Sequence, residues 1–343
     1  PMAKRLMCTA PGQLAWQDVD VPPVGPTQVR IRPEHAAAKH GTEMAFYKGY
    51  AIGRGRYDPE LQVFNKVEDP QTLYPFGVGN MIVGLVEEVG ASVSRLSLGD
   101  RVCVYSGFAD AVVRDESQCW LMPEGMPWQT AVCLDPAEFA LGAVRDGHVR
   151  IGDNVALFGL GAIGLVVLQL LKLAGARRII ALDPLVSRRE LALSLGATLV
   201  LDPTNCDAGL ELKKTTGGRG PDVIIEYSGS QAAFQAALRG IAYGGNVVLG
   251  AFPPAYGAGL DLGGEAHHNV PNIIFTRACS VPNRDHPRWD EPRLFDTCWE
   301  LLTAGKLTGV PIVHPVVPFA NLLDEYPKIA TMPQTYLKLG ADY

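Results

Sequence analysis

The sequence predicts an α/β protein in which a doubly wound parallel sheet is accompanied by a second, mostly-β domain. Strand-like and helix-like patterns alternate from Ile151 onward, and such alternation is typical of a parallel sheet with right-handed crossovers. Residues 1 to about 135 instead show short β-branched runs separated by glycine, proline and aspartate. A chain of 343 residues is also long enough for two domains with a core each.

In the mostly-β part, strands are expected where β-branched residues cluster between turn residues. These runs fall at 28–32, 81–90, 101–105 and 109–113. Segment 53–73 is polar and irregular, so we expect a long surface loop there. From about Arg284 the loops return, and a helix near 291–305 precedes proline-bounded strands. We therefore expect the C-terminal tail to complete the first domain, with the parallel-sheet domain inserted.

The parallel-sheet part alternates regularly between the two patterns. Its strands are predicted near 154–158, 178–182, 198–201, 222–226, 246–250 and 272–276. Its helices are predicted near 162–175, 187–195, 207–216 and 231–241. The expected division of the chain is therefore 1–148 for the first part of the mostly-β domain, 149–285 for the inserted domain and 286–343 for the remainder.

A glycine fingerprint lies between the first of these strands and the helix after it. Gly159, Gly161 and Gly164 have the G-x-G-x-x-G spacing of a dinucleotide-binding turn. The first glycine permits the tight turn, the second lets the backbone approach a pyrophosphate, and the third lets helix and strand pack closely. The expected cofactor contacts therefore run from Gly159 through Leu160, Gly161, Ala162 and Ile163 to Gly164.

The second strand of this domain ends in an acid, Asp183, about 20 residues after the fingerprint. A carboxylate at this spacing binds the adenosine ribose hydroxyls and would repel the extra phosphate of NADP, so NAD is the expected cofactor. Gly250 and Ala251 end a later strand and are expected to contact the nicotinamide through their backbone. The alternative is a glycine-rich turn in a doubly wound domain that binds no nucleotide.

Composition excludes several classes of function. The formal net charge is −6 with 47% hydrophobic and 19% charged residues, so there is no electrostatic footprint for nucleic acid or an anionic membrane. No apolar run has membrane-spanning length, and the first residues show no secretory signal. The seven cysteines are scattered and never form a C-x-x-C pair. Reduced thiols in a cytoplasmic protein are therefore expected.

Over essentially its whole length the chain resembles the medium-chain dehydrogenase/reductase family of the alcohol dehydrogenase type. The resemblance is carried by Gly99-Asp-Arg-Val102, Gly107-Phe-Ala-Asp110, the glycine fingerprint and Gly220-Pro-Asp-Val-Ile-Ile-Glu-Tyr-Ser-Gly229. It implies a Rossmann domain that binds NAD, joined to a GroES-like, mostly-β catalytic domain. It also implies that Arg188 contacts the adenosine, whereas a surface charge on a helix is the alternative. A homodimer or homotetramer that associates through an edge strand of the nucleotide domain is expected.

Within that family the chain is most similar to the bacterial D-guloside 3-dehydrogenases, which act at C3 of glycosides. The shared strings are Lys39-His-Gly-Thr-Glu43, Gly79-Asn-Met-Ile-Val-Gly84, Asp135-Pro-Ala-Glu-Phe-Ala140, Gly142-Ala-Val-Arg-Asp146, Arg277-Ala-Cys-Ser280 and Pro287-Arg-Trp289. This resemblance implies a small-molecule sugar substrate. It also implies hydride transfer between a secondary alcohol and NAD, with no nucleic-acid or membrane partner.

The zinc enzymes of the family keep a cysteine, a histidine and a further cysteine or glutamate as metal ligands. In this chain the corresponding positions are His40, Asn80 and Asp135, so the usual donor set is lost. We expect no catalytic zinc, although His40 and Asp135 with Glu43 could form a weak site. The four closely spaced cysteines of the structural zinc lobe are absent from the sequence, so no structural metal is expected either.

Without zinc, a side chain must accept the hydroxyl proton when hydride leaves. His40 is the leading general base because an imidazole exchanges protons near neutral pH. Asp135 could orient the ring and stabilise its charged form, although an N-cap role is also open. The resemblance implies that Thr42 relays the proton, and Asn80 could donate to the carbonyl oxygen. Lys39 is the competing acid or base.

Several further residues have two interpretations. Glu43 is either a structural partner for an arginine or a residue that supports the site from behind. Trp289 with Arg288, and Tyr47 with Lys48, could line a sugar cleft or could pack at the surface. Two other functions also remain open. One is a zinc-free quinone or enoyl reductase, which Asp183 and the proton donors near residue 40 disfavour. The other is a nucleotide-binding protein without catalysis.

Overall fold

The computed structural model describes residues 2–343 and divides them into two compact units. The first unit contains the residues up to Val132 together with Ile312–Tyr343, and we call it the mostly-β unit. The second unit contains Cys133–Pro311, and we call it the α/β unit. The predicted α/β class, with a doubly wound parallel sheet beside a mostly-β part, is confirmed.

The mostly-β unit contains three sheets, with strand orders β2-β1-β6, β4-β5 and β10-β8-β7-β3-β18-β17, and β9 pairs with β3 beside the last of these. Its strands are β1 (Met2–Ala10), β2 (Gln13–Asp20), β3 (Gln28–Ala37), β4 (Arg56–Asp58), β5 (Val63–Asn65), β6 (Phe76–Gly77), β7 (Met81–Val89), β8 (Arg101–Tyr105), β9 (Val112–Asp115), β10 (Trp120–Leu121), β17 (Val316–Pro318) and β18 (Gly340–Asp342). Its helices are α1 (His40–Tyr47), α2 (Trp128–Ala131), α10 (Leu322–Glu325) and α11 (Lys328–Thr331), with the short 3₁₀ turns η1 (Ile52–Arg54), η2 (Pro70–Leu73), η3 (Glu116–Gln118) and η4 (Phe319–Asn321).

The predicted strands at 28–32, 81–90 and 101–105 correspond to β3, β7 and β8. The prediction at 109–113 was displaced, because β9 begins only at Val112. The predicted irregular loop over 53–73 was wrong in part, since β4 and β5 form a hairpin there. Its cross-strand pair Tyr57 and Phe64 supplies the β propensity that the surrounding polar residues concealed.

The core of the mostly-β unit is formed by apolar side chains from both ends of the chain. Val29 and Ile31 of β3 and Val104 of β8 share one buried cluster with Tyr326 and Leu339 from the C-terminal tail. The tail is also paired in the sheet, because β18 runs antiparallel to β3 with Gly340 opposite Ala37. Residues about 300 positions apart therefore come together at the end of β3, immediately before α1.

The α/β unit has one six-stranded, entirely parallel sheet of order β13-β12-β11-β14-β15-β16. Numbered along the chain, this is the order 3-2-1-4-5-6 of a Rossmann fold. Its strands are β11 (Asn154–Phe158), β12 (Arg178–Leu182), β13 (Leu199–Leu201), β14 (Val223–Glu226), β15 (Asn246–Leu249) and β16 (Asn272–Phe275). Its helices are α3 (Leu134–Asp146), α4 (Ala162–Leu173), α5 (Val186–Leu195), α6 (Ala208–Thr215), α7 (Gln231–Gly240), α8 (Glu265–Asn269) and α9 (Glu291–Thr303).

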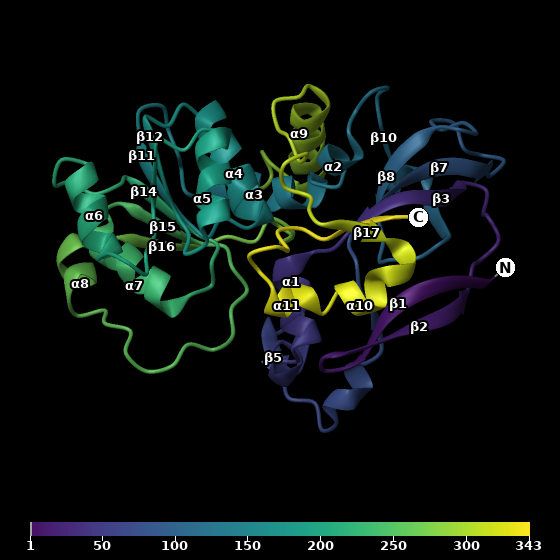
Figure 1. The fold of residues 1–343 in the computed structure, drawn as a ribbon, viewed down its shortest axis with the longest axis horizontal. Helices are drawn as coiled ribbons and strands as arrows, with labels where there is room; N and C mark the ends of the chain where they lie inside the picture. Colours follow the sequence, from purple (N-terminus) through teal and green to yellow (C-terminus); the bar gives the residue numbers. More distant parts are fainter. Residues whose placement is uncertain (1) are drawn as a thin grey trace. The chain divides into compact units, whose positions relative to one another are not determined.

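Helices cover both faces of this sheet (Figure 1). Residues of α6 and α7 share a buried cluster with one face of β11, β12 and β14, while α3 and α4 pack against each other. All six predicted strands and four predicted helices of this region are confirmed to within a few residues. The buried strands are almost purely apolar, as strands covered on both faces must be.

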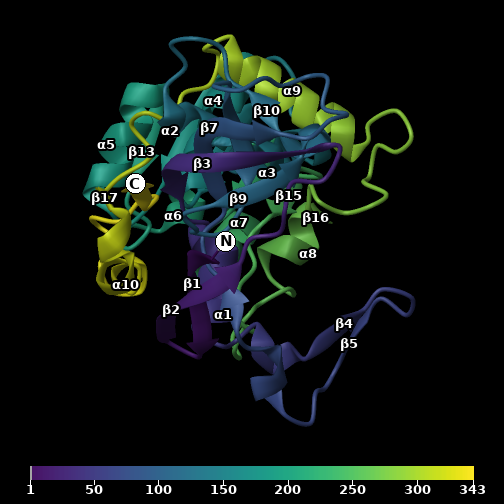
Figure 2. The same cartoon turned by 90° about the vertical axis from the view of Figure 1, so that its right-hand side faces the viewer.

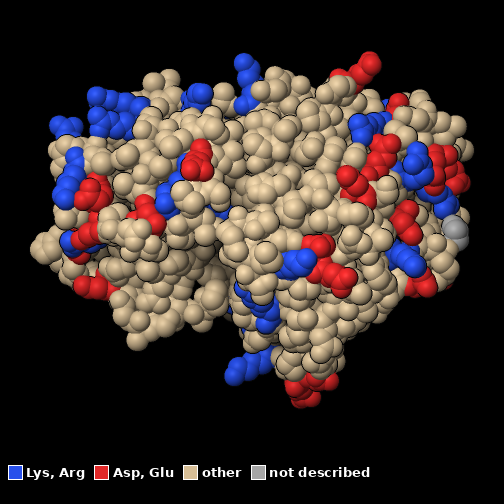
Figure 3. Space-filling model, viewed as in Figure 1, with Lys and Arg blue, Asp and Glu red and all other residues tan. Residues whose placement is uncertain are grey.

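The order of the sheet also indicates where a ligand binds. The strand order reverses between β11 and β14, which are parallel neighbours in the sheet, and open α/β sheets bind ligands at the carboxyl ends of the strands at such a switch point. On the face that Figure 3 shows, acidic and basic side chains are interspersed without a large field of one sign. Among residues 2–343, no helix has both the length and the apolar character required to span a bilayer.

Candidate active site

The glycine turn after β11 has the geometry that each glycine of the fingerprint requires. Gly159 has φ +88°, and a Cβ there would lie 2.6 Å from the amide nitrogen of Ser228. A Cβ on Gly164 would lie 2.0 Å from the carbonyl oxygen of Gly159. A Cβ on Gly161 would meet nothing within 4 Å. The first and third glycines are therefore needed by the fold, and the second leaves open the space that a pyrophosphate would occupy.

The N-terminus of α4, the helix that follows this turn, borders that space. Gly161 is the N-cap of α4, and no side chain caps its first turn. The amide groups of a helix N-terminus have no partners within the helix, and the helix dipole favours an anion there. The residues Leu160 to Gly164 thus fit the phosphates of a dinucleotide.

Asp183 directly follows β12 and is fixed beside the glycine turn. Only 4% of its surface is exposed. Its Oδ2 accepts the N–H of Leu160 at 2.9 Å, and its Oδ1 accepts the N–H of Leu185 at 2.9 Å. A carboxylate oxygen can accept two hydrogen bonds, so both oxygens keep capacity for ribose hydroxyls. The Nη1 of Arg188 lies 3.9 Å from Oδ2 of Asp183, and burial lowers the pKa of this arginine.

A second buried carboxylate, Glu226, ends β14 and was not singled out from the sequence. It accepts the N–H groups of Ser228 at 2.6 Å and Gly229 at 3.0 Å, and thereby fixes the turn that touches Gly159. Burial raises the pKa of Glu226, and these hydrogen bonds oppose that shift. The adjacent Gly250 has no room for a side chain, because a Cβ would lie 2.4 Å from the ring of Tyr227.

In the mostly-β unit, His40 is the first residue of α1. Its Nε2 accepts the backbone N–H of Leu339 at 2.8 Å. A backbone N–H can only donate, so the neutral ring carries its proton on Nδ1. The predicted base is therefore held in one tautomer by a residue of the C-terminal tail. A proton can reach Nε2 only if the ring gives up this hydrogen bond.

Glu43 lies one turn further along α1 and is half-buried. Its Oε2 accepts the N–H of Lys39, the N-cap residue, and so satisfies a backbone donor at the start of the helix. Its Oε1 accepts the N–H of Gly79 at 2.5 Å and the hydroxyl of Tyr326 at 3.0 Å. Burial raises the pKa of Glu43, whereas these hydrogen bonds and the charge of Lys338 lower it. No arginine is among these partners, so the expectation of an arginine partner for Glu43 finds no support here.

Lys338 is a functional candidate that the sequence analysis missed. Only 1% of its surface is exposed, and its Nζ donates to the carbonyl oxygen of Ala38 at 2.7 Å. The N–H of Ala38 in turn donates to the carbonyl oxygen of Leu339 at 2.9 Å. Lys338 and Leu339 are therefore hydrogen-bonded to Ala38, the residue that directly precedes Lys39 and His40. The sequence feature that could have indicated a buried lysine is its position within the apolar run Leu337 to Ala341.

Two further predicted residues of this unit lie close to His40 in the chain or in the sheet. Thr42 is partly buried in the first turn of α1. Asn80 is anchored beside the end of β3, because its N–H donates to the carbonyl oxygen of Ala37 at 2.9 Å. Among residues 2–343, the side-chain Nδ2 of Asn80 is buried and finds no hydrogen-bond acceptor. An unpaired buried donor is costly, and an oxygen of a ligand could satisfy it.

Asp135 belongs to the α/β unit. It lies in the first turn of α3 and is 2% exposed. The alternative N-cap role is wrong, because Cys133 occupies the N-cap position of α3. A carboxylate in a first helical turn is favoured by the helix dipole. The predicted action of Asp135 on His40 stays a prediction.

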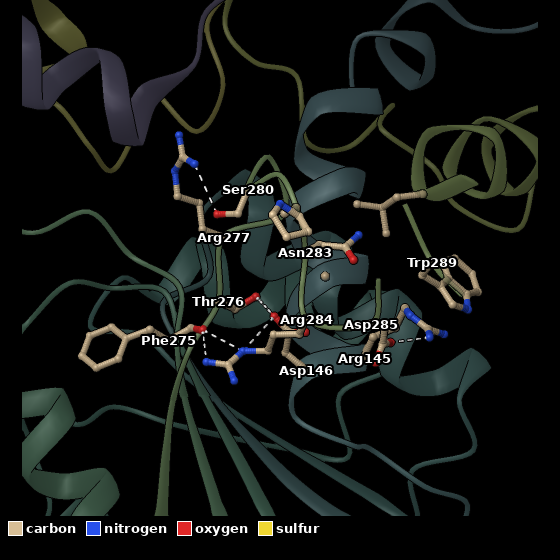
Figure 4. Close-up of a pocket in the computed structure, with 14 residues that line it drawn as sticks. Arg145, Asp146, Phe275, Thr276, Arg277, Ser280, Asn283, Arg284, Asp285 and Trp289 are labelled. Atoms are coloured by element: carbon tan, nitrogen blue, oxygen red, sulfur yellow. Dashed lines mark hydrogen bonds and ion pairs between the residues drawn. The ribbon is translucent and has the colours of Figure 1, made fainter. Parts of the chain in front are cut away.

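The α/β unit also contains a cavity of about 290 Å³ between α3, the segment after β16 and the start of α9 (Figure 4). Trp289 lines it, but guanidinium groups lie over its ring, with Arg145 at 3.6 Å and Arg293 at 4.2 Å from the centroid. Arg145 also forms an ion pair with Asp285 at 2.6 Å. This ring is therefore used for packing and offers little surface to a sugar.

Tyr47 is likewise a packing residue. It is buried, its hydroxyl donates to the carbonyl oxygen of Gly12 at 3.1 Å, and its ring meets that of Tyr326 edge-on at 5.6 Å. The prediction that Tyr47 lines a sugar cleft is wrong, and so is its alternative of packing at the surface, because Tyr47 packs in the core. A buried aromatic ring with a satisfied hydroxyl is the ordinary form of a core tyrosine.

Comparison with known proteins agrees with both units. Residues 25–149 match the family model of the alcohol dehydrogenase GroES-like domain, and residues 162–278 match that of the zinc-binding dehydrogenases. The chain is 40% identical to D-guloside 3-dehydrogenase of Escherichia coli K12, over 99% of this chain and 100% of that protein. It is 27% identical to human sorbitol dehydrogenase, over 71% of this chain and 73% of that protein.

Solved structures confirm the fold. The 2R,3R-butanediol dehydrogenase of Bacillus subtilis superposes with a TM-score of 0.79 at 22% identity, over 99% of both chains. The chain therefore belongs to the zinc-type alcohol dehydrogenase family of medium-chain dehydrogenases. It is a dehydrogenase acting on CH–OH groups, with a GroES-like domain and a Rossmann domain.

The residues at the family's zinc positions do not fit the metal. A catalytic zinc takes three ligands from histidine, cysteine and carboxylate. The Nε2 lone pair of His40 is engaged by Leu339, and both oxygens of Glu43 accept other hydrogen bonds. The side chain of Asn80 is an amide, a poor ligand for zinc. Among the residues that the structure describes, no group of three or more His, Cys, Asp or Glu side chains could hold a metal ion.

Proposed function

We propose that this protein is an NAD-dependent sugar or polyol dehydrogenase that oxidises a secondary alcohol at C3 of a glycoside such as a D-guloside, or reduces the 3-keto sugar. The observation that carries this proposal is the 40% identity over the full length to D-guloside 3-dehydrogenase. The polar residues of the mostly-β unit suit a substrate with many hydroxyl groups. None of the seven cysteines, all within residues 2–343, forms a disulfide, which supports a cytoplasmic location.

NAD is proposed as the cofactor because Asp183 lies where the adenosine ribose would be bound. A buried carboxylate at that position accepts ribose hydroxyls and repels a 2′-phosphate. When bound, NAD supplies the acceptor for the hydride. The glycine turn binds the pyrophosphate, Arg188 contacts the adenosine, and the backbone of Gly250 and Ala251 contacts the nicotinamide in this proposal.

The hydroxyl proton must leave as the hydride is transferred, and His40 is the proposed acceptor. In its resting state the Nε2 lone pair of His40 holds the N–H of Leu339. Proton uptake therefore requires the ring to exchange this hydrogen bond for one with the substrate hydroxyl. Lys39 is the alternative acceptor. Asp135 is proposed to stabilise the charged imidazole.

Asn80 and Thr42 are proposed to bind the reacting oxygen. The unpaired Nδ2 of Asn80 is a donor suited to an oxygen that gains negative charge. Thr42 can both donate and accept, so it can pass a proton between the substrate and His40. Glu43 touches the N-terminus of α1 and the Gly79 turn, so we propose that it positions His40 and Asn80. Together these groups would do without zinc what the family's metal does.

The test is to mix the protein with NAD or NADP and a panel of glycosides and polyols, and to follow the absorbance of the reduced nicotinamide. Reduction of NAD that depends on a glycoside, with a 3-keto sugar as product, is the expected result. Turnover of quinones or enones with NADPH would instead indicate the zinc-free reductase branch. Dinucleotide binding without turnover of any substrate would indicate a protein that has lost catalysis.

A further inference from the structure

The strands β4 and β5 form a two-stranded sheet of their own in the mostly-β unit. The hairpin follows α1 in the chain, and Figure 2 shows it extending away from α1, β1 and β2. A hairpin of two strands is at best marginally stable in water when nothing packs against it. An additional strand that paired with the hairpin would therefore stabilise it.

The hairpin carries apolar side chains that remain in water. Every residue from Pro59 to Lys66 is exposed. Tyr57 and Phe64 face each other across the strands with ring centroids 5.2 Å apart, yet 49% of Tyr57 and 48% of Phe64 are exposed. Leu61, within the turn that joins the two strands, is 69% exposed. Apolar residues gathered on one protruding hairpin indicate a contact surface.

The backbone of β4 has an open edge at Tyr57. The carbonyl oxygen of Asp58 accepts the N–H of Gln62 at 2.8 Å, so the polar backbone groups of Asp58 point toward β5. Successive residues of a strand direct their N–H and C=O groups to opposite sides. Those of Tyr57 therefore point outward, where another strand could pair with them.

The side chains of β4 are complementary to a second copy of the same strand. Its sequence is Arg56-Tyr57-Asp58, with opposite charges on either side of the central residue. In an antiparallel pair centred on Tyr57, Arg56 lies opposite Asp58 of the partner, and opposite charges across a strand pair are stabilising. Oδ1 of Asp58 binds the turn, whereas Oδ2 has only a 3.5 Å contact with Asn65 and can meet a guanidinium.

The other edge of the hairpin lacks this property. The residues of β5 are Val63, Phe64 and Asn65, which carry no charge. A copy of β5 paired with itself would therefore bring no ion pair across the junction. We therefore assign the contact to the edge of β4, whose charged residues Arg56 and Asp58 can form ion pairs across the junction.

We infer that β4 is a contact surface for a second copy of this chain. The two β4 strands pair antiparallel about a two-fold axis at Tyr57 and make a four-stranded sheet in the order β5-β4-β4-β5. A two-fold contact uses the same patch on both copies, as this self-complementary strand requires. With three residues a side, the contact is weak alone and reinforces other contacts between copies.

The inference is tested by two cysteine variants of the full chain, Tyr57→Cys and Phe64→Cys. The two positions have nearly equal exposure and lie on the same face of the hairpin. In the proposed pairing, the two residues 57 face each other with their Cα atoms about 5.5 Å apart, a separation that a disulfide can bridge. The two residues 64 are three strand spacings apart, about 14 Å, which a disulfide cannot bridge.

Mild oxidation should therefore convert Tyr57→Cys into a covalent dimer on a non-reducing gel, while Phe64→Cys and the unmodified protein stay largely monomeric there. Arg56→Glu added to Tyr57→Cys should slow cross-linking at least tenfold, because it places like charges opposite each other. Equal cross-linking of both cysteine variants, or none with Tyr57→Cys, would overturn the inference. Thermal unfolding of each variant verifies that it is folded.

Discussion

The predicted functional residues fall into two halves, one in each unit, and the two halves are encoded in different ways. The nucleotide half consists of Gly159 to Gly164 with Asp183, a segment of 25 residues in which Gly164 packs on Gly159 and Asp183 accepts the N–H of Leu160. The half around His40 combines the start of α1 with Gly79, Tyr326 and residues 338 and 339. A local motif keeps its geometry because short-range sterics dictate it. The second half depends on the tail returning to β3, so its chemistry follows from the tertiary fold.

The largest expected effect tests the half around His40. His40→Ala should lower kcat for sugar oxidation by about 10²–10⁴-fold, because it removes the proposed proton acceptor. The affinity for NADH, measured by fluorescence titration, should stay unchanged because the glycine turn is intact. Lys39→Met is the matched neighbour and should have a much smaller effect. The reverse ranking of the two variants would transfer the role to Lys39.

The glycine turn can be separated into its structural and ligand-binding parts. Gly164→Ala should destabilise the protein by about 1–3 kcal/mol or more and abolish NADH binding, because its Cβ would collide with the carbonyl of Gly159. Gly161→Ala should leave the melting temperature unchanged, since its Cβ meets nothing, yet weaken NADH binding at least tenfold. Calorimetry and fluorescence titration measure the two effects. Equal loss of stability in both variants would contradict the assigned roles.

Lys338→Met tests the contribution of the tail. The variant loses the hydrogen bond to Ala38 and removes the cation that favours the charged form of Glu43, so we expect a loss of about 1–3 kcal/mol in stability and a lower kcat. NADH binding should be retained. The exposed Lys306→Met serves as the control. An unchanged kcat with Lys338→Met would show that proton transfer does not depend on how the tail holds His40.

The smallest expected effect concerns cofactor choice. Asp183→Ser removes the carboxylate that repels a 2′-phosphate, so the ratio of kcat/KM for NADP to that for NAD should rise about tenfold, or about 1.4 kcal/mol. Initial rates with both cofactors measure it. Arg188, whose Nη1 lies 3.9 Å from Asp183, remains in place and would attract the 2′-phosphate. A preference for NADP in the unmodified protein would refute the assignment of NAD.

The same two halves differ in how much of their structure could be predicted from the sequence. The strands and helices of the α/β unit were predicted because buried parallel strands are continuous apolar runs and the glycine spacing is local. The hairpin of β4 and β5 was missed because its polar residues resemble a loop. Lys338, Leu339 and Tyr326 could not be assigned to His40, since no local pattern reports that the tail pairs with β3. The occupied Nε2 of His40 is likewise visible only in three dimensions.

The central claim is that side chains around His40, and no zinc ion, support the reaction, and metal analysis combined with activity tests it most directly. The protein should be purified without chelator, analysed for zinc, treated with chelator and assayed for glycoside-dependent reduction of NAD. The account predicts less than a tenth of an equivalent of zinc per chain and unchanged turnover after chelation. One equivalent of zinc, with activity lost on chelation and restored by added zinc, would contradict it.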